Sequence, residues 1–365
     1  TEFDRRIHDA LLAIEAVAYT QPDLAGLYPL SLSARTQVFK GRLNSNEVMP
    51  YFQDLVDPAH AIHTLYFHTR FSTNTDPHPT MAQPFRLMAH NGELNTDKKN
   101  RLSETALARA RNREIVRPHG QSDSCRLDQT LQSRVVEDGL DLVTAVVSMM
   151  PPAWENDSTL SSEVRAMLEY FSLYEEKNDG PAALIFGDGT VVGARLDRLG
   201  LRPLRSVETD EYLCVTSEAG QIDFDPETVL HRGRIEAGGM LYFDHREGRS
   251  YSTDEALELL ASRNDYPALV ARPAGPSSAA RGRGRAGTVA LQRRPRAHPA
   301  LRRVLAQPGK LQVHDGPDAR VGSGEDLRDG LRQRHQRALR SGRRGGEVLL
   351  AAFRSGHEPF ARQHP

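Results

Sequence analysis

Four short clusters of polar residues, at positions 68–74, 89–96, 120–125 and 196–205, contain side chains that could do chemistry. Each cluster lies at the end of an apolar run or beside a turn signal, where functional groups are usually placed. In the first cluster, Arg70 closes a predicted strand, and its planar guanidinium could donate two hydrogen bonds to a ligand carboxylate. An ion pair between Arg70 and a structural acid is the competing interpretation.

The second cluster centres on Asn91 and Gly92, which follow the apolar run 85–89. The side-chain amide of Asn91 and the backbone N–H of Gly92 would be two adjacent donors, which are the parts of an oxyanion hole. The same Asn-Gly pair is also a strong signal for a tight hairpin turn. The pair alone leaves both interpretations open.

The third and fourth clusters offer charged groups. Asp123 precedes a predicted helix that starts near Leu127, so its carboxylate could cap that helix or bind a ligand ammonium. The cluster at 196–205 alternates charges around Gly200, which is more typical of a salt-bridged loop. The two cysteines, Cys125 and Cys214, exclude a disulfide framework and a four-cysteine zinc site. We therefore expect a reducing, cytoplasmic location.

The elements that would position these clusters show alternating helical and strand periodicity. We predict helices over 3–19, 127–138, 142–150 and 161–174, and strands over 61–71, 85–89, 182–186, 190–194, 212–216 and 240–244. Because strands occur in antiparallel-looking groups with helices between them, the pattern favours the α+β class over a doubly wound parallel sheet. No apolar run reaches the roughly 18 residues that a membrane helix needs, so we expect no membrane association.

The near-neutral net charge of -1 hides an asymmetry along the chain. Residues 1–270 hold 27 basic and 41 acidic side chains, whereas residues 271–365 hold 20 basic and 7 acidic ones. The basic segment contains 19 Arg, one Lys and no Ile, Tyr or Trp. Its Arg/Ala/Gly/Pro-rich composition predicts disorder, and it is what translation of a GC-rich gene in a shifted reading frame would produce. A nucleic-acid-binding arm is less favoured, because such arms commonly mix Lys with Arg and add aromatic residues.

Taken together, the clusters resemble the class II glutamine amidotransferase domain of the large subunit of glutamate synthase. The resemblance extends over residues 3–260 and rests on seven motifs in a matching order: HTRFSTNT at 68–75, AQPFR at 82–86, AHNGELNT at 89–96, QSDS at 121–124, NDGPA at 178–182, GLRP at 200–203 and TSE at 216–218.

The resemblance implies an N-terminal-nucleophile hydrolase, which is a four-layer αββα sandwich that hydrolyses the side-chain amide of L-glutamine and releases ammonia for a synthase domain. It implies that Arg70 holds the α-carboxylate of glutamine and Asp123 its α-ammonium. Asn91, through its side chain, and Gly92, through its N–H, would stabilise the oxyanion. FMN, an iron–sulfur cluster and the small subunit belong to other parts of the family's enzymes. We expect no cofactor and no metal in this chain.

The nucleophile of the family, an N-terminal Cys, has no counterpart here. Residue 1 is Thr and heads a predicted helix, and Cys125 beside Asp123 is more typical of a packed side chain. We therefore expect residues 1–265 to form an N-terminally truncated amidotransferase domain, inactive for want of its nucleophile. Residues 266–365 would form the disordered tail. The alternative is a module that binds glutamine or assists assembly without catalysis.

Overall fold

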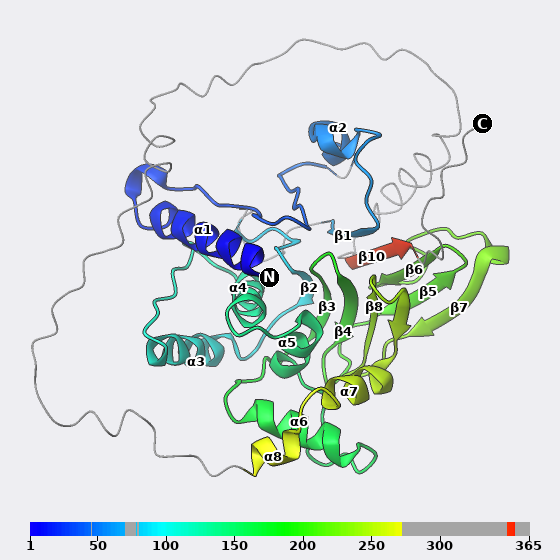
Figure 1. Ribbon diagram of the computed structural model, residues 1–365. Helices are drawn as coiled ribbons and strands as arrows, with labels where there is room; N and C mark the ends of the chain where they lie inside the picture. The colour runs from blue at the N-terminus through cyan, green and yellow to red at the C-terminus, as the bar shows by residue number, and fades with distance from the viewer. Residues whose placement is uncertain (45, 70–77, 79, 272–348, 355–365) are drawn as a thin grey trace, which may run out of the picture. The chain divides into compact units, whose positions relative to one another are not determined.

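The computed structural model describes residues 1–44, 46–69, 78, 80–271 and 349–354. These residues form helices and two antiparallel five-stranded sheets (Figure 1). The α+β class expected from the sequence is confirmed.

The first sheet has the strand order β1-β10-β6-β5-β7. Its strands are β1 (Thr64–His68), β10 (Leu349–Arg354), β6 (Tyr212–Thr216), β5 (Arg205–Thr209) and β7 (Val229–Arg234). Strand β10 lies almost three hundred residues after β1 in the chain. In the sheet it pairs antiparallel with β1 on one side and with β6 on the other. Within the described residues, β1 therefore joins the sheet only through β10.

The second sheet has the strand order β2-β3-β4-β8-β9. Its strands are β2 (Met88–Gly92), β3 (Ala182–Gly187), β4 (Val191–Leu196), β8 (Met240–Asp244) and β9 (Arg249–Tyr251). Strands β3 and β4 lie at the predicted runs 182–186 and 190–194 and pair with each other as an antiparallel hairpin. Every residue of these two strands is buried, as expected for a sheet covered on both faces.

The helices begin and end close to the predicted positions where a clear apolar stripe exists. They are α1 (Glu2–Ala18), α2 (Val48–Tyr51), α3 (Asp97–Ala110), α4 (Asp123–Val136), α5 (Leu142–Met149), α6 (Ser162–Ser172), α7 (Thr253–Ala261) and α8 (Tyr266–Val270). Three single 3₁₀ turns lie at Pro22–Leu24, Gln53–Leu55 and Pro226–Thr228. Ser161, the first residue of the range predicted for this helix, caps α6 and accepts a hydrogen bond from Val164 N at 3.2 Å. None of the helices in the described part of the chain is both long and apolar enough to cross a membrane.

Two apolar cores lie on opposite faces of the second sheet. Along β3, Leu184 and Phe186 pack into a core with α4, α5, α6 and α7, whereas Ala183 and Ile185 pack into a second core. The second core also holds Val215 of β6, so it lies between the two sheets. Because alternate side chains of β3 point to opposite faces, one face packs on the helices and the other on the first sheet. The helices, the second sheet and the first sheet therefore form three successive layers.

The predicted tail over 266–365 lies mostly outside the described residues. Two elements within it are described, and both depart from the expected disorder. Helix α8 begins at the first tail position, where Tyr266 is buried against Tyr170 and Phe171 of α6. Strand β10 lies at Leu349–Arg354, whose sequence is a short apolar run. The folded part therefore extends past the boundary expected at 265.

Candidate functional site

Asn91 and Gly92 are the last two residues of β2, not the centre of a hairpin turn. Strand β2 pairs with β3, and Asn91 and Gly92 lie opposite Ala183 and Ala182. Asn91 is buried, and Gly92 has a φ of 150°, a conformation that favours glycine. A Cβ atom at Gly92 would lie 1.8 Å from the carbonyl oxygen of Pro181, so only glycine fits here. The hairpin interpretation of this pair is wrong, because β2 finds its partner about ninety residues later in the chain.

The connection that follows β2 is fastened to its surroundings by backbone hydrogen bonds. Glu93 N donates to Pro181 O at 2.9 Å, and Asn95 N donates to Asp179 O at 2.7 Å. Between them, Leu94 N donates to a side chain, the Oδ2 atom of Asp123, at 2.9 Å. The segment carrying the two predicted oxyanion donors is therefore joined directly to the predicted ammonium ligand.

Asp123 is the first residue of α4, which begins four residues before the predicted start. The cap is Ser122, whose Oγ accepts from Cys125 N at 3.0 Å, so the interpretation of Asp123 as the cap is wrong. The Oδ1 atom of Asp123 accepts from Ser124 N at 2.6 Å and from Ser124 Oγ at 3.1 Å. The carboxylate is half-buried and held through both oxygens, with lone pairs left for a ligand.

His90 precedes Asn91 in β2, and no function was predicted for it. Its Nδ1 atom lies 2.7 Å from Ser124 Oγ, and its ring is buried. Burial lowers the pKa of His90, although the nearby Asp123 carboxylate acts in the opposite direction. The ring is therefore neutral near pH 7 and contacts the same serine that binds Asp123.

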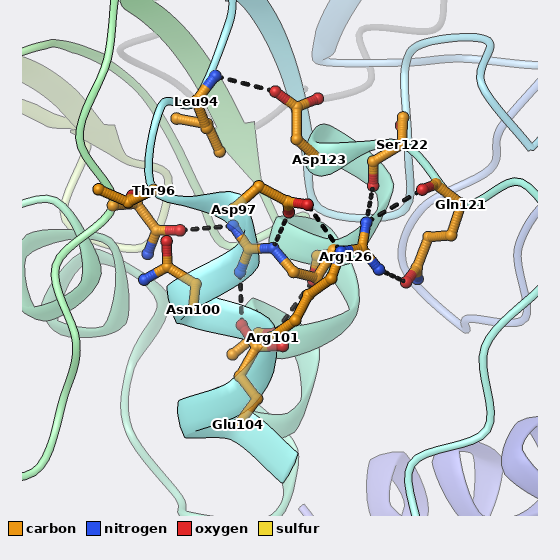
Figure 2. Close-up of polar contacts among 12 residues, drawn as sticks. Leu94, Thr96, Asp97, Asn100, Arg101, Glu104, Gln121, Ser122, Asp123 and Arg126 are labelled. Carbon is orange, nitrogen blue, oxygen red and sulfur yellow. Dashed lines mark hydrogen bonds and ion pairs between the residues drawn. The ribbon is translucent and has the colours of Figure 1, made fainter.

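Two arginines converge on Asp97, the first residue of α3 (Figure 2). Arg101 donates from Nε to Asp97 Oδ2 at 2.7 Å, and Arg126 of α4 donates from Nε to Asp97 Oδ1 at 2.7 Å. Burial raises the pKa of Asp97, but the hydrogen bonds from the two arginines outweigh it and leave the pKa below the ordinary value. Asp97 is thus a carboxylate that connects α3 to α4.

Arg126 is fully buried, and its charge is balanced by two acids. It pairs with Glu104 in addition to Asp97, and it donates to Asn178 Oδ1 at 2.5 Å. Sequence reasoning missed Arg126, because it lies beside the apolar stripe that defined the helix. For helix α3, the four-residue spacing of Asp97 and Arg101 was the signal in the sequence that could have indicated an ordered polar helix.

The remaining predicted groups have different outcomes. Arg70 lies outside the described residues. In the cluster at 196–205, Asp197 accepts hydrogen bonds from Leu199 N and Leu201 N, and Arg198 forms an ion pair with Asp179 at 2.8 Å. The interpretation of this cluster as a salt-bridged loop is confirmed.

The two cysteines and the first residue, Thr1, are each engaged in local structure. Cys125 is buried, contacts Tyr28 and Gln121 through its sulfur, and has a pKa raised by burial. Burial also raises the pKa of Cys214 in β6 to about 12. Thr1 caps α1, and its hydroxyl and amino groups both contact Asp4. Neither thiol has the exposed, electropositive surroundings of a reactive cysteine.

Two cavities lie away from these groups. One, of about 150 Å³, lies beside α5 and α6. Its three acids, Glu155, Glu175 and Glu176, already pair with Lys177, Arg134 and Lys99. The other, of about 240 Å³, lies at the ends of β5, β7 and β8. Neither is lined by Asn91, Gly92 or Asp123, so we place the candidate site by its hydrogen-bonded groups. Among the residues that the structure describes, no cluster of three His, Cys, Asp or Glu could hold a metal ion.

Residues 1–269 match the family described as "Glutamine amidotransferases class-II". The chain belongs to the class II glutamine amidotransferases. The matched range contains all four polar clusters, and it ends one residue before the end of α8.

The relatives of this amidotransferase domain include glutamate synthases. It is 37% identical over 250 residues to the NADH glutamate synthase of Schizosaccharomyces pombe (66% of this chain, 12% of the relative). It is 36% identical over 280 residues to the chloroplastic ferredoxin-dependent glutamate synthase of Oryza sativa subsp. japonica (73% and 17%). It is 37% identical over 254 residues to the NADPH glutamate synthase large chain of Bacillus subtilis (66% and 16%). The domain therefore spans between 12% and 17% of these relatives.

Among solved structures, the amidotransferase domain has a likeness to the glutamine phosphoribosylpyrophosphate amidotransferase of B. subtilis, in complex with ADP and GMP. The sequence identity is 18%, the likeness covers 45% of this chain and 28% of the other, and the TM-score is 0.25.

Proposed function

We propose that this class II domain binds L-glutamine and stabilises the oxyanion formed when the side-chain amide is hydrolysed to glutamate and ammonia. The observation that carries the proposal is the hydrogen bond from Leu94 N to Asp123 Oδ2. It joins a half-buried carboxylate at the start of α4 to the strand end that carries Asn91 and Gly92.

Asp123 is suited to an ammonium group because ionised carboxylates only accept hydrogen bonds, and a charged partner strengthens them. Asn91 contributes a side-chain amide and Gly92 a backbone N–H, and such paired donors stabilise a tetrahedral oxyanion. Arg70 completes the proposal on the grounds of its sequence motif, as the ligand of the glutamine α-carboxylate.

The covalent step needs a nucleophile, and both thiols of this chain are buried with raised pKa values. We therefore propose that the 365-residue chain binds glutamine without hydrolysing it. The same observation favours a second candidate function, which is a glutamine-binding or assembly module without catalysis.

The wider proposal follows the glutamate synthases that the chain is similar to. In a glutamate synthase whose nucleophile is present, the ammonia released would pass to synthase domains acting with a small subunit, in the cytoplasm, and this chain itself would hold no cofactor. We also propose that the three layers described above belong to a four-layer αββα sandwich of the N-terminal-nucleophile type, with the further helical layer on the outer face of the first sheet.

Calorimetry with L-glutamine tests the proposal. Wild-type chain is expected to bind, and Asp123→Asn is expected to weaken binding by about tenfold or more, because a charged hydrogen bond to the α-ammonium is lost. Arg198→Met, which removes a salt bridge in the neighbouring loop, serves as a control for general loss of structure. Equal affinities in wild type and Asp123→Asn would refute the assignment of Asp123.

A further inference from the structure

Arg101 contacts both residues that precede Asp123 in the chain (Figure 2). It donates from Nη1 to Gln121 Oε1 at 2.9 Å and from Nη2 to Gln121 O at 3.0 Å. The same Nη2 atom donates to Ser122 O at 3.2 Å. One planar guanidinium therefore fixes a side-chain oxygen and two successive carbonyl groups, which the single ammonium of a lysine could not do in this geometry.

The guanidinium is itself held in place from its own helix. Arg101 Nε donates to Asp97 Oδ2, and the other oxygen of Asp97 accepts from the fully buried Arg126. The Arg101 side chain is about a quarter exposed, so its ion pair with Asp97 is partly sheltered from solvent. The donors thus point at the 121–122 segment from a fixed position.

These contacts close a ring around the candidate site. From Asn91 the chain passes through Leu94 to Asp97 and Arg101 on α3. Arg101 binds the segment directly before Asp123, and Asp123 binds back to Leu94 N. The spacing between Asp123 and the end of β2 is therefore determined by a covalent path through α3 together with the hydrogen bonds that Arg101 makes.

We infer that Arg101 is a positioning residue that sets Asp123 relative to Asn91 and Gly92 and so determines recognition of the α-ammonium group of the substrate. This inference rests on the proposed function for its ligand, whereas its structural part does not need a ligand. Arg101 contacts neither of the two proposed oxyanion donors by any described hydrogen bond, and it acts through Gln121 and Ser122.

The structural part is tested by amide hydrogen exchange of the full 365-residue chain without ligand. In Arg101→Met the Leu94 amide is expected to exchange at least about tenfold faster than in wild type, because its acceptor on Asp123 is no longer held in place. Arg109→Met is the matched control, since Arg109 is an exposed arginine on the same helix. Unchanged exchange at Leu94 in Arg101→Met would overturn the inference whatever the chain binds.

The ligand part is tested by calorimetry with L-glutamine and with glutaramate, the same molecule without its α-ammonium group. Arg101→Met and Arg101→Lys are expected to bind glutamine about tenfold more weakly than wild type and Arg109→Met, with little change for glutaramate. An equal loss for both ligands would show a merely structural effect and overturn the inference. If the wild-type chain binds neither ligand, the proposed function is wrong, and so is the role of Arg101 in ligand recognition. The hydrogen-exchange result would still decide whether Arg101 positions Asp123.

Discussion

Arg126 donates from Nε to Oδ1 of Asp97 across 2.7 Å, which ties the first turn of α4 to the first turn of α3. Asp123 lies one turn before Arg126 on α4, and the end of β2 lies just before α3 in the chain. The proposed ammonium ligand and the proposed oxyanion donors are therefore supported by one charge pair, between the fully buried Arg126 and the half-buried Asp97.

Replacing Arg126 by Met is expected to destabilise the protein by about 3–5 kcal/mol, because the buried Glu104 would lose its closest partner and the half-buried Asp97 would keep only Arg101. Urea denaturation followed by circular dichroism measures this. Arg111→Met is the control, since Arg111 pairs with Asp138 at the surface and its loss is expected to cost less than about 1 kcal/mol. Adding Glu104→Gln to Arg126→Met is expected to recover part of the loss. A cost for Arg126→Met no larger than that of the control would contradict the described network.

Replacing Gly92 by Ala is expected to cost more than about 3 kcal/mol, since backbone strain of about 1–3 kcal/mol is joined by overlap with Pro181 O. Gly139→Ala provides the comparison, because Gly139 also has a positive φ, of 74°, but has open space around its Cβ position. That variant is expected to lose only about 1–2 kcal/mol. Similar melting temperatures for the two variants would show that β2 does not end as described.

The sequence predicted several of the buried elements, although not helix α7, and it predicted the polar elements poorly. Strands β3, β4, β6 and β8 have apolar runs and turn signals, so hydrophobic pattern alone locates them. Helix α3 was missed because its buried residues are Asn100 and Glu104, which no apolar periodicity can reveal. Their burial depends on partners far along the chain, since Asn100 Nδ2 donates to Glu176 O at 2.9 Å.

The residues of the candidate site could also be predicted only in part. The residue types of Asn91, Gly92 and Asp123 suggested their chemistry, and the family resemblance suggested their grouping. Position within an element was harder to predict, because the Asn-Gly pair reads as a turn unless the distant strand β3 is known to lie beside it. Arg101 and Arg126 could not be assigned from sequence, because a charged residue on a helix is usually solvated.

The stability of the fold is expected to fall as the pH decreases from about 6.5 to about 4. His245 Nε2 lies 2.7 Å from Thr64 Oγ1, and its ring packs against His63 with the centroids 4.1 Å apart. Burial and the charge of His63 lower the pKa of His245 to about 4, against Asp244 and Asp188, which act to raise it. In the unfolded chain His245 is therefore protonated below about pH 6.5, whereas in the folded chain it is protonated only below about pH 4. Because the unfolded state binds more protons between these values, lowering the pH favours unfolding over this range.

Urea midpoints measured between pH 7 and pH 4 check this dependence. His245→Gln is expected to reduce the slope and to leave part of it, because burial also lowers the pKa values of His8 and His90. His60→Gln, at a ring that packs against Phe39, is the matched control. An identical slope in wild type and His245→Gln would show that His245 titrates normally in the folded protein.

The two thiols are expected to be inert in the native chain. Cys125 and Cys214 are 5% and 1% exposed, and burial raises the pKa of both, so the reactive thiolate is scarce at pH 8. A chromogenic disulfide reagent should therefore label neither within minutes in buffer and both in 6 M guanidinium chloride. Ammonia release from glutamine should likewise stay at background in this chain, and it should be the same in Asn91→Ala, because an oxyanion hole without an attacking thiolate has no tetrahedral intermediate to stabilise. Release that depends on Asn91, or rapid labelling of Cys125 that glutamine prevents, would show that a nucleophile is active within these 365 residues.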